Sequence, residues 1–135
     1  MLNERSTVST ALAEAETPAR AEGALHSFVA ALGSADLGAA TACFTREGCM
    51  ITPDGTAVHG RAGIGPLLAQ LIARETEIEI EQLAIHTARD VALATGRLAI
   101  RSDGGRLVQS CGPTVALQRV EGTWKIAVLA PWASA

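Results

Sequence analysis

Residues 77–85 read EIEIEQLAI and carry the clearest structural pattern in the chain. Its first five residues alternate strictly between glutamate and isoleucine, which is the two-residue period of a half-buried β-strand. After Gln82 the apolar residues change parity and continue at Leu83 and Ile85. A β-bulge near Gln82 would return these side chains to one face, and a bulge bends its strand. We therefore expect a bent strand here.

The next segment, residues 91–101, shows the same change of parity. Its large apolar residues are Val91 and Leu93 before Gly96, and Leu98 and Ile100 after it. Two bends in neighbouring strands predict a strongly curved sheet.

Turn residues divide the end of the chain into an antiparallel meander. The segments 102–105 (SDGG) and 121–122 (EG) are typical hairpin turns, and they separate strands expected at about 91–101, 106–120 and 123–131. Gly112-Pro113 interrupts the middle strand, because proline cannot donate a hydrogen bond to the ladder. This interruption predicts a kink, a sheet edge or an opening.

The first half of the chain has helical periodicity. A helix is expected from Thr17-Pro18, a cap followed by a proline at the first helical position, to Gly33. Its apolar stripe consists of Ala21, Leu25, Phe28, Val29 and Leu32. A short second helix follows, with Leu37, Ala40 and Phe44 as its stripe.

A short hairpin and a third helix complete this half. Residues 49–51 and 57–59 are expected to pair around the turn Pro53-Asp54-Gly55, and a helix is expected over about 61–74. The predicted fold class is α+β, a cone-shaped roll of a strongly curved antiparallel sheet wrapped around three N-terminal helices. Residues 1–17 are expected to form a flexible or weakly docked arm, and residues 18–135 a single domain.

Composition narrows the class of protein. The chain has 135 residues, 48% of them hydrophobic and 19% charged, which indicates one globular domain. The net charge is −3 without a block of like charges, so nucleic acid is not expected as a partner. No apolar run approaches the roughly 18 residues of a membrane span, and no signal peptide pattern is present, so we expect a cytoplasmic protein that does not associate with membranes. Cys43, Cys49 and Cys111 lack a zinc-binding or disulfide spacing, and neither a metal nor a cofactor is expected.

Four segments together resemble one known superfamily. They are HSFVAALGSADL at 26–37, TPDG at 52–55, VHGRAGI at 58–64 and GTWKI at 122–126. In this order they are similar to the nuclear transport factor 2-like superfamily, most of all its SnoaL-like and ketosteroid-isomerase-like branch. The resemblance covers about residues 20–132 and implies the cone fold and a homodimer formed through the sheet. The superfamily includes isomerases, polyketide cyclases, dehydratases, epoxide hydrolases and binding subunits, so it does not define one activity.

The catalytic set of ketosteroid isomerases is absent at the matching positions. The resemblance places Phe28 where those enzymes have a hydroxyl donor on the first helix, and Thr52 where they have the aspartate base. Their second aspartic acid falls near Val115 or Ala116. Phenylalanine and valine cannot stabilise an oxyanion by hydrogen bonding, so isomerisation by that apparatus is not expected.

Three residues remain as catalytic candidates, each with a structural alternative. Asp54 is a possible base for SnoaL-like chemistry or an ordinary turn residue. His59 is a possible base or ligand donor, or a histidine at the rim. Arg97 is a buried cation facing an acidic ligand, or an arginine on the outer surface of the sheet. Whether there is any turnover stays open; an active protein would be an isomerase, cyclase or hydrolase that uses acid–base chemistry without a metal.

Two functions follow from these observations. The first is binding of a small hydrophobic molecule in the cone, as a SnoaL-like accessory enzyme of polyketide-type secondary metabolism. The second is a non-catalytic, dimeric binding or assembly module. The residues expected to bind the ligand are Phe28, Leu32, Phe44, Met50, Thr52, Leu67, Leu71, Ser110, Val115, Leu117 and Trp132.

Overall fold

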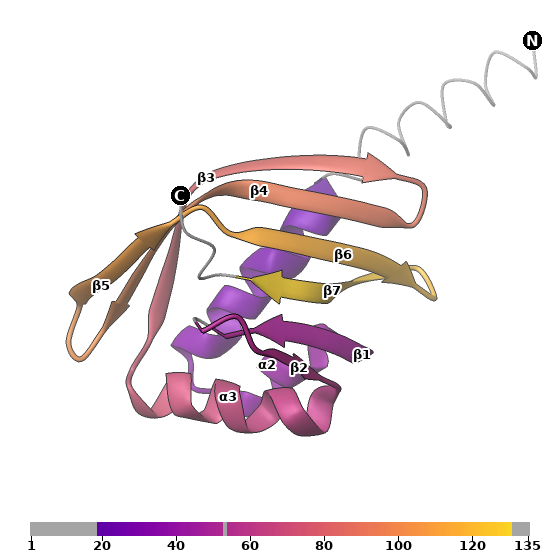
Figure 1. Cartoon of the computed structure of the whole chain (residues 1–135). Coiled ribbons are helices and arrows are strands. Elements are labelled where there is room, and N and C mark those ends of the chain that lie inside the picture. The colour runs from indigo at the N-terminus through magenta and orange to yellow at the C-terminus, as the bar shows by residue number, and fades with distance from the viewer. Residues whose placement is uncertain (1–18, 53, 131–135) are drawn as a thin grey trace, which may run out of the picture.

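The computed structural model describes residues 19–52 and 54–130, without the side chains of residues 108–111. The first helix covers 19–33 and is followed by two further helices and seven strands (Figure 1). These are α2 (Leu37–Ala42), β1 (Phe44–Ile51), β2 (Ala57–His59), α3 (Arg61–Ala73), β3 (Glu77–Ala88), β4 (Val91–Ser102), β5 (Arg106–Cys111), β6 (Thr114–Val120) and β7 (Thr123–Ala130).

The seven strands form one curved sheet in the order β2-β1-β7-β6-β4-β3, with β5 paired to β4. Among the described strands, every pairing is antiparallel except β1 with β7, which is parallel. Figure 1 shows the first helix crossing the concave side of this sheet, and α3 packs beside β1 and β2. The α+β cone predicted from the sequence is confirmed.

A line of bends crosses three strand segments at one level. The β3–β4 register shifts between Ile80 and Gln82, as the change of parity predicts. Opposite this bulge, a Cβ on Gly96 would lie 1.9 Å from the carbonyl oxygen of Gln82, so only glycine fits there. Gly112-Pro113 lies next along this line, because a Cβ on Gly112 would lie 3.4 Å from the Gly96 oxygen. β4 therefore pairs with β6 through residues 91–95 and with β5 through residues 98–102.

In the first half of β4 the side chains that face the core are small, and the large apolar side chains face outward. Val91 and Leu93 are 53% and 43% exposed, whereas Ala92 and Ala94 are buried in the core cluster with Phe28. Small side chains at the inward positions let the first helix approach the sheet closely. The larger side chains of this half of β4 consequently lie on the outer face.

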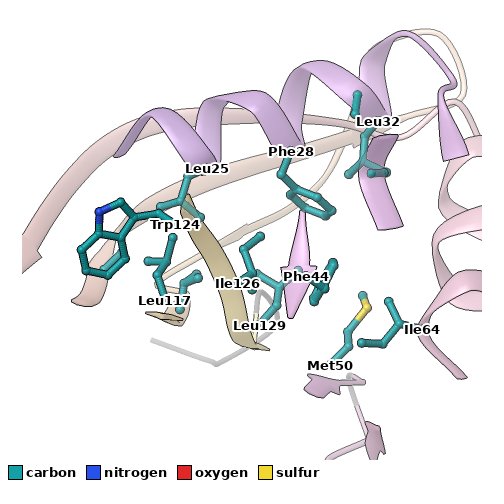
Figure 2. Close-up of a cluster of buried hydrophobic side chains, with 14 of the residues drawn as sticks. Leu25, Phe28, Leu32, Phe44, Met50, Ile64, Leu117, Trp124, Ile126 and Leu129 are labelled. Carbon is teal, nitrogen blue, oxygen red and sulfur yellow. The ribbon is translucent and has the colours of Figure 1, made fainter. Parts of the chain in front are cut away.

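Phe44 does not belong to the second helix, which corrects the sequence prediction. α2 ends at Ala42, and Phe44 begins β1, where it pairs with Ile126 of β7. Its ring is fully buried and meets the Phe28 ring edge to face, with the centroids 5.5 Å apart (Figure 2). The tertiary burial of this ring outweighs the weak helical periodicity that ends at residue 44.

Candidate functional site

An apolar cavity lies where the curved sheet bends away from the first helix. It is lined by Leu25, Phe28, Val29, Ile78, Ile80, Leu83, Ala94, Leu98, Pro113, Val115 and Leu129. Its volume is about 30 Å³, and every described side chain in its lining is apolar. Small-molecule sites usually enclose roughly 300 Å³ or more, so a ligand of that size requires the cavity to widen.

One side of this cavity is less firmly packed than the other. Leu25, Phe28, Leu98 and other deep lining residues are buried. Val29 on the first helix and Ile78, Ile80 and Leu83 on β3 are only half-buried. The gap between the first helix and β3 is therefore the side from which the cavity can be reached.

The residues expected to bind a ligand fall into three groups. Phe28 and Val115 line the cavity. Leu32, Phe44, Met50 and Leu117 are buried in the adjoining core, and Leu67 and Leu71 of α3 pack against that core. Thr52 is half-buried beside the turn, whereas Trp132 and the side chain of Ser110 lie outside the described residues. The ligand-binding role of all eleven stays a prediction.

Sequence reasoning missed the contribution of β3 and β4 to the lining. Ile78, Ile80, Leu83 and Leu98 are the residues whose change of parity predicts the bend. The same pattern also identifies the side chains beside the bend on the concave face, and these form one wall of the cavity. Leu25 and Val29 share a helix face with Phe28 and complete the opposite wall.

Asp54 is an exposed turn residue whose carboxylate is held by its neighbours. It accepts hydrogen bonds from the Thr52 hydroxyl and from the Thr56 backbone N–H, the latter at 3.1 Å. These bonds stabilise the ionised form and lower the pKa of Asp54, the Thr52 bond having the larger effect. A carboxylate with a lowered pKa is ionised at neutral pH but is a weaker proton acceptor than an ordinary one.

The structure does not bring the three catalytic candidates together. His59 ends β2, is exposed, and pairs with Cys49 of β1. Arg97 is exposed on β4 opposite Gln82, and three strands separate β4 from β2 in the sheet. None of Asp54, His59 and Arg97 is among the described lining of the cavity. Their catalytic roles remain predictions.

The outer face of the sheet carries a row of small and apolar side chains with a histidine at each end. Cross-strand pairing connects His86, Leu93, Ala116, Val128, Cys49 and His59 from β3 to β2. Beside this row, Val91 and Val120 are 53% and 42% exposed. Exposed apolar side chains that gather on one sheet face are typical of interaction surfaces.

Comparison with known proteins identifies the family. The SnoaL-like domain family matches residues 22–129, so the chain belongs to this family. No protein with a curated description matches the sequence. In the described part of the chain, no helix is long and apolar enough to cross a membrane.

Solved structures with the same fold differ widely in description. An NTF2-like protein with a cystatin-like fold from Novosphingobium aromaticivorans superimposes with a TM-score of 0.79 at 15% identity, covering 93% of this chain and 86% of that one. A candidate dehydratase of the NTF2-like family from Streptomyces avermitilis has a TM-score of 0.74 at 19% identity, with 84% and 92% covered. A candidate calcium/calmodulin-dependent protein kinase II association domain from Xanthomonas campestris has a TM-score of 0.70 at 15% identity, with 78% and 79% covered. At such identities the likeness establishes the fold alone.

Proposed function

We propose that this chain binds a small hydrophobic molecule in the apolar cavity, as an accessory protein of polyketide-type secondary metabolism. The observation that carries the proposal is the lining, in which every described side chain is apolar. Burial of apolar surface would supply most of the affinity, at about 25 cal/mol per Å². Membership of the SnoaL-like family and the similarity to a candidate dehydratase support a small-molecule role.

Ligand entry in this proposal widens the cavity from the side of the first helix and β3. The half-buried side chains of Val29, Ile80 and Leu83 move outward, while the buried floor around Phe28 stays in place. The described side chains of the lining have no proton donor or acceptor. In this proposal they hold the bound molecule and exclude water from it. An acid–base step would need a group from outside this lining, for which Asp54, His59 and Arg97 remain the candidates.

Binding of the neutral dye Nile red tests this proposal. Val29→Phe fills the accessible side, and Ala94→Leu fills the floor, so each variant should weaken saturable binding by about tenfold or more. Ala84→Leu is the matched control, because Ala84 is exposed on β3 and is not among the described lining residues. No saturable binding by the native chain, or equal binding by all three variants, would show that the cavity is only a packing gap.

A dimeric assembly module is the second candidate function. The exposed Val91, Leu93 and Val120 on the outer sheet face favour it, and a structural neighbour is described as an association domain. In this proposal two copies associate through their sheets.

Light scattering of Leu93→Glu tests the second candidate. A dimer through the sheet face predicts that the native chain is dimeric and that Leu93→Glu is monomeric, because a buried unpaired carboxylate is unfavourable. Leu107→Glu is the control, since Leu107 is 52% exposed but lies on β5, away from this face. A native monomer, or dissociation by both variants alike, would exclude this interface.

A further inference from the structure

Two surface grooves meet at Lys125, beside the turn between β6 and β7. The first has a volume of about 330 Å³ and lies between that turn and the first helix, with Arg20 and Ser27 on the helix side. The second has a volume of about 320 Å³ and reaches Arg46 of β1 and Arg61 of α3. Thr123 and Lys125 line both, so the grooves share one wall.

Positive charge is concentrated in these grooves, although the net charge of the whole chain is negative. Arg20, Arg46, Arg61 and Lys125 line them, whereas Glu121 is the one acidic residue in their described lining. The whole chain has a net charge of −3. The local excess of cations is therefore a property of this place in the fold and not of the composition.

Backbone carbonyls position two of these cations and leave donors free for a ligand. Lys125 Nζ donates to the Ala42 oxygen at 2.8 Å, and Arg61 donates through Nε and Nη2 to the Phe44 oxygen at 3.2 and 2.6 Å. An ammonium has three donors and a guanidinium five, so both groups retain unused N–H bonds. In the described part of the chain, neither these two nor Arg46 has a carboxylate within ion-pair distance.

Trp124 lines the first groove and carries a further hydrogen-bond donor. Its side chain is largely buried, with 6% of the residue exposed, and the Arg119 guanidinium lies 5.7 Å from the ring centroid. No hydrogen bond between described residues engages its indole N–H. Since no fully buried side-chain N or O atom among the described residues lacks a partner, this nitrogen retains some exposure to solvent. Ammonium, guanidinium, indole and hydroxyl donors together suit an anion with several acceptor oxygens.

We propose that these grooves bind a small molecule that carries a phosphate or pyrophosphate group, with the anionic group at Lys125. Arginine and lysine together match the charge and the several oxygens of such a group. The site is independent of the apolar cavity, because the described linings of the grooves and of the cavity have no residue in common. The proposal therefore does not rest on binding of a hydrophobic molecule.

Calorimetric titration with inorganic pyrophosphate at constant ionic strength tests the site. The native chain should bind saturably, and Lys125→Gln and Arg46→Gln should each weaken binding by about tenfold. Arg74→Gln is the matched control, because it removes the same charge at the exposed end of α3 and should leave affinity unchanged. Lys125→Arg keeps the charge and should stay within about threefold of the native affinity, which separates loss of charge from loss of fold.

Three results would overturn the proposal. The first is the absence of a saturable heat signal with up to about 10 mM pyrophosphate, because weaker binding would not indicate a specific site. The second is equal weakening by Arg74→Gln and Lys125→Gln, which would indicate a general effect of net charge. The third is equally tight binding of citrate, which would show that phosphate chemistry is not what the grooves recognise.

Discussion

The two flanks of the first helix offer opposite environments. Leu25 and Phe28 face a cavity of about 30 Å³ whose described lining is entirely apolar. Arg20 and Ser27 face a groove of about 330 Å³ that also contains Lys125. Affinity in the cavity would come from burial, which depends little on salt, whereas affinity in the groove would come from charge, which salt screens. One helix can thus serve two kinds of binding, because the sheet bends beside one flank and Lys125 of β7 lies beside the other.

Gly96→Val should produce the largest effect, because it removes the bend that makes the cavity. A Cβ at this position would lie 1.9 Å from the Gln82 oxygen, so the β3–β4 pairing must break or shift. We expect the free energy of unfolding, measured in urea, to fall by more than about 4 kcal/mol. Gly23→Ala, at an exposed position inside the first helix, is the control: its Cβ would meet no side chain within 4 Å apart from those of its chain neighbours, and it should stabilise the chain by about 0.5 kcal/mol. Equal stability of the two variants would contradict the account of the bend.

Phe28→Ala should have the next largest effect and should separate the two flanks. The ring lines the cavity and packs edge to face on Phe44, so its removal should reduce the free energy of unfolding by about 3 kcal/mol. Nile red binding should change, whereas pyrophosphate binding should not, since Phe28 is outside the described lining of the grooves. Leu107→Ala, at an exposed position outside the described cavity and groove linings, should change stability by less than about 0.5 kcal/mol. A parallel change in both kinds of binding would show that the two flanks are coupled.

Alkylation of Cys43 reports on the groove with a smaller effect. Burial raises the pKa of this thiol, and the Lys125 ammonium opposes the rise. Cys43 should therefore react with iodoacetamide several-fold more slowly at neutral pH than an unhindered thiol, and its rate should rise only at higher pH. Lys125→Gln should slow it further, because loss of the nearby cation leaves burial unopposed. Mass spectrometry of the modified peptide measures this rate, and a faster reaction in Lys125→Gln would show that the cation does not act on the thiol.

The smallest effect concerns Asp54, which lies outside both binding regions. Its folded-state pKa is lowered by hydrogen bonds from Thr52 and Thr56, so the associated stability is present above the unfolded-state pKa. That contribution is lost as the pH falls through the lowered folded-state pKa. A carbon-detected NMR titration should show the lowered pKa, and Thr52→Val should raise it toward the ordinary value. An unchanged pKa in Thr52→Val would mean that the hydroxyl does not stabilise the carboxylate.

Local patterns predicted the elements more reliably than their ends. The parity change at Gln82 correctly predicts the bulge in β3, and the turn residues at 102–105 correctly predict the hairpin between β4 and β5. The boundary between α2 and β1 was predicted wrongly, because Phe44 fits the helical spacing of Leu37 and Ala40. Burial against Phe28 and pairing with Ile126 decide its conformation, and neither contact is visible in the local sequence.

The candidate sites were predicted less completely than the fold. The sequence analysis includes Phe28 and Val115 among the expected ligand-binding residues, and both line the cavity. It uses Ile80, Leu83 and Leu98 only to predict bends in the strands, although they line the cavity as well. The grooves were not anticipated, because Arg20, Arg46, Arg61 and Lys125 are far apart in the chain and form no motif.

Periodicity, turn residues and glycine predict most of the helices and strands, the bulge near Gln82 and the α+β class, because these signals act over a few residues. Tertiary packing decides that β1 lies parallel to β7, that Ala92 and Ala94 face inward, and that Lys125 lines one groove with Arg46 and Arg61. These outcomes depend on which distant segments pack together. Such packing depends on burial and shape complementarity between segments far apart in the chain. The short-range periodicity of the sequence contains no information about it.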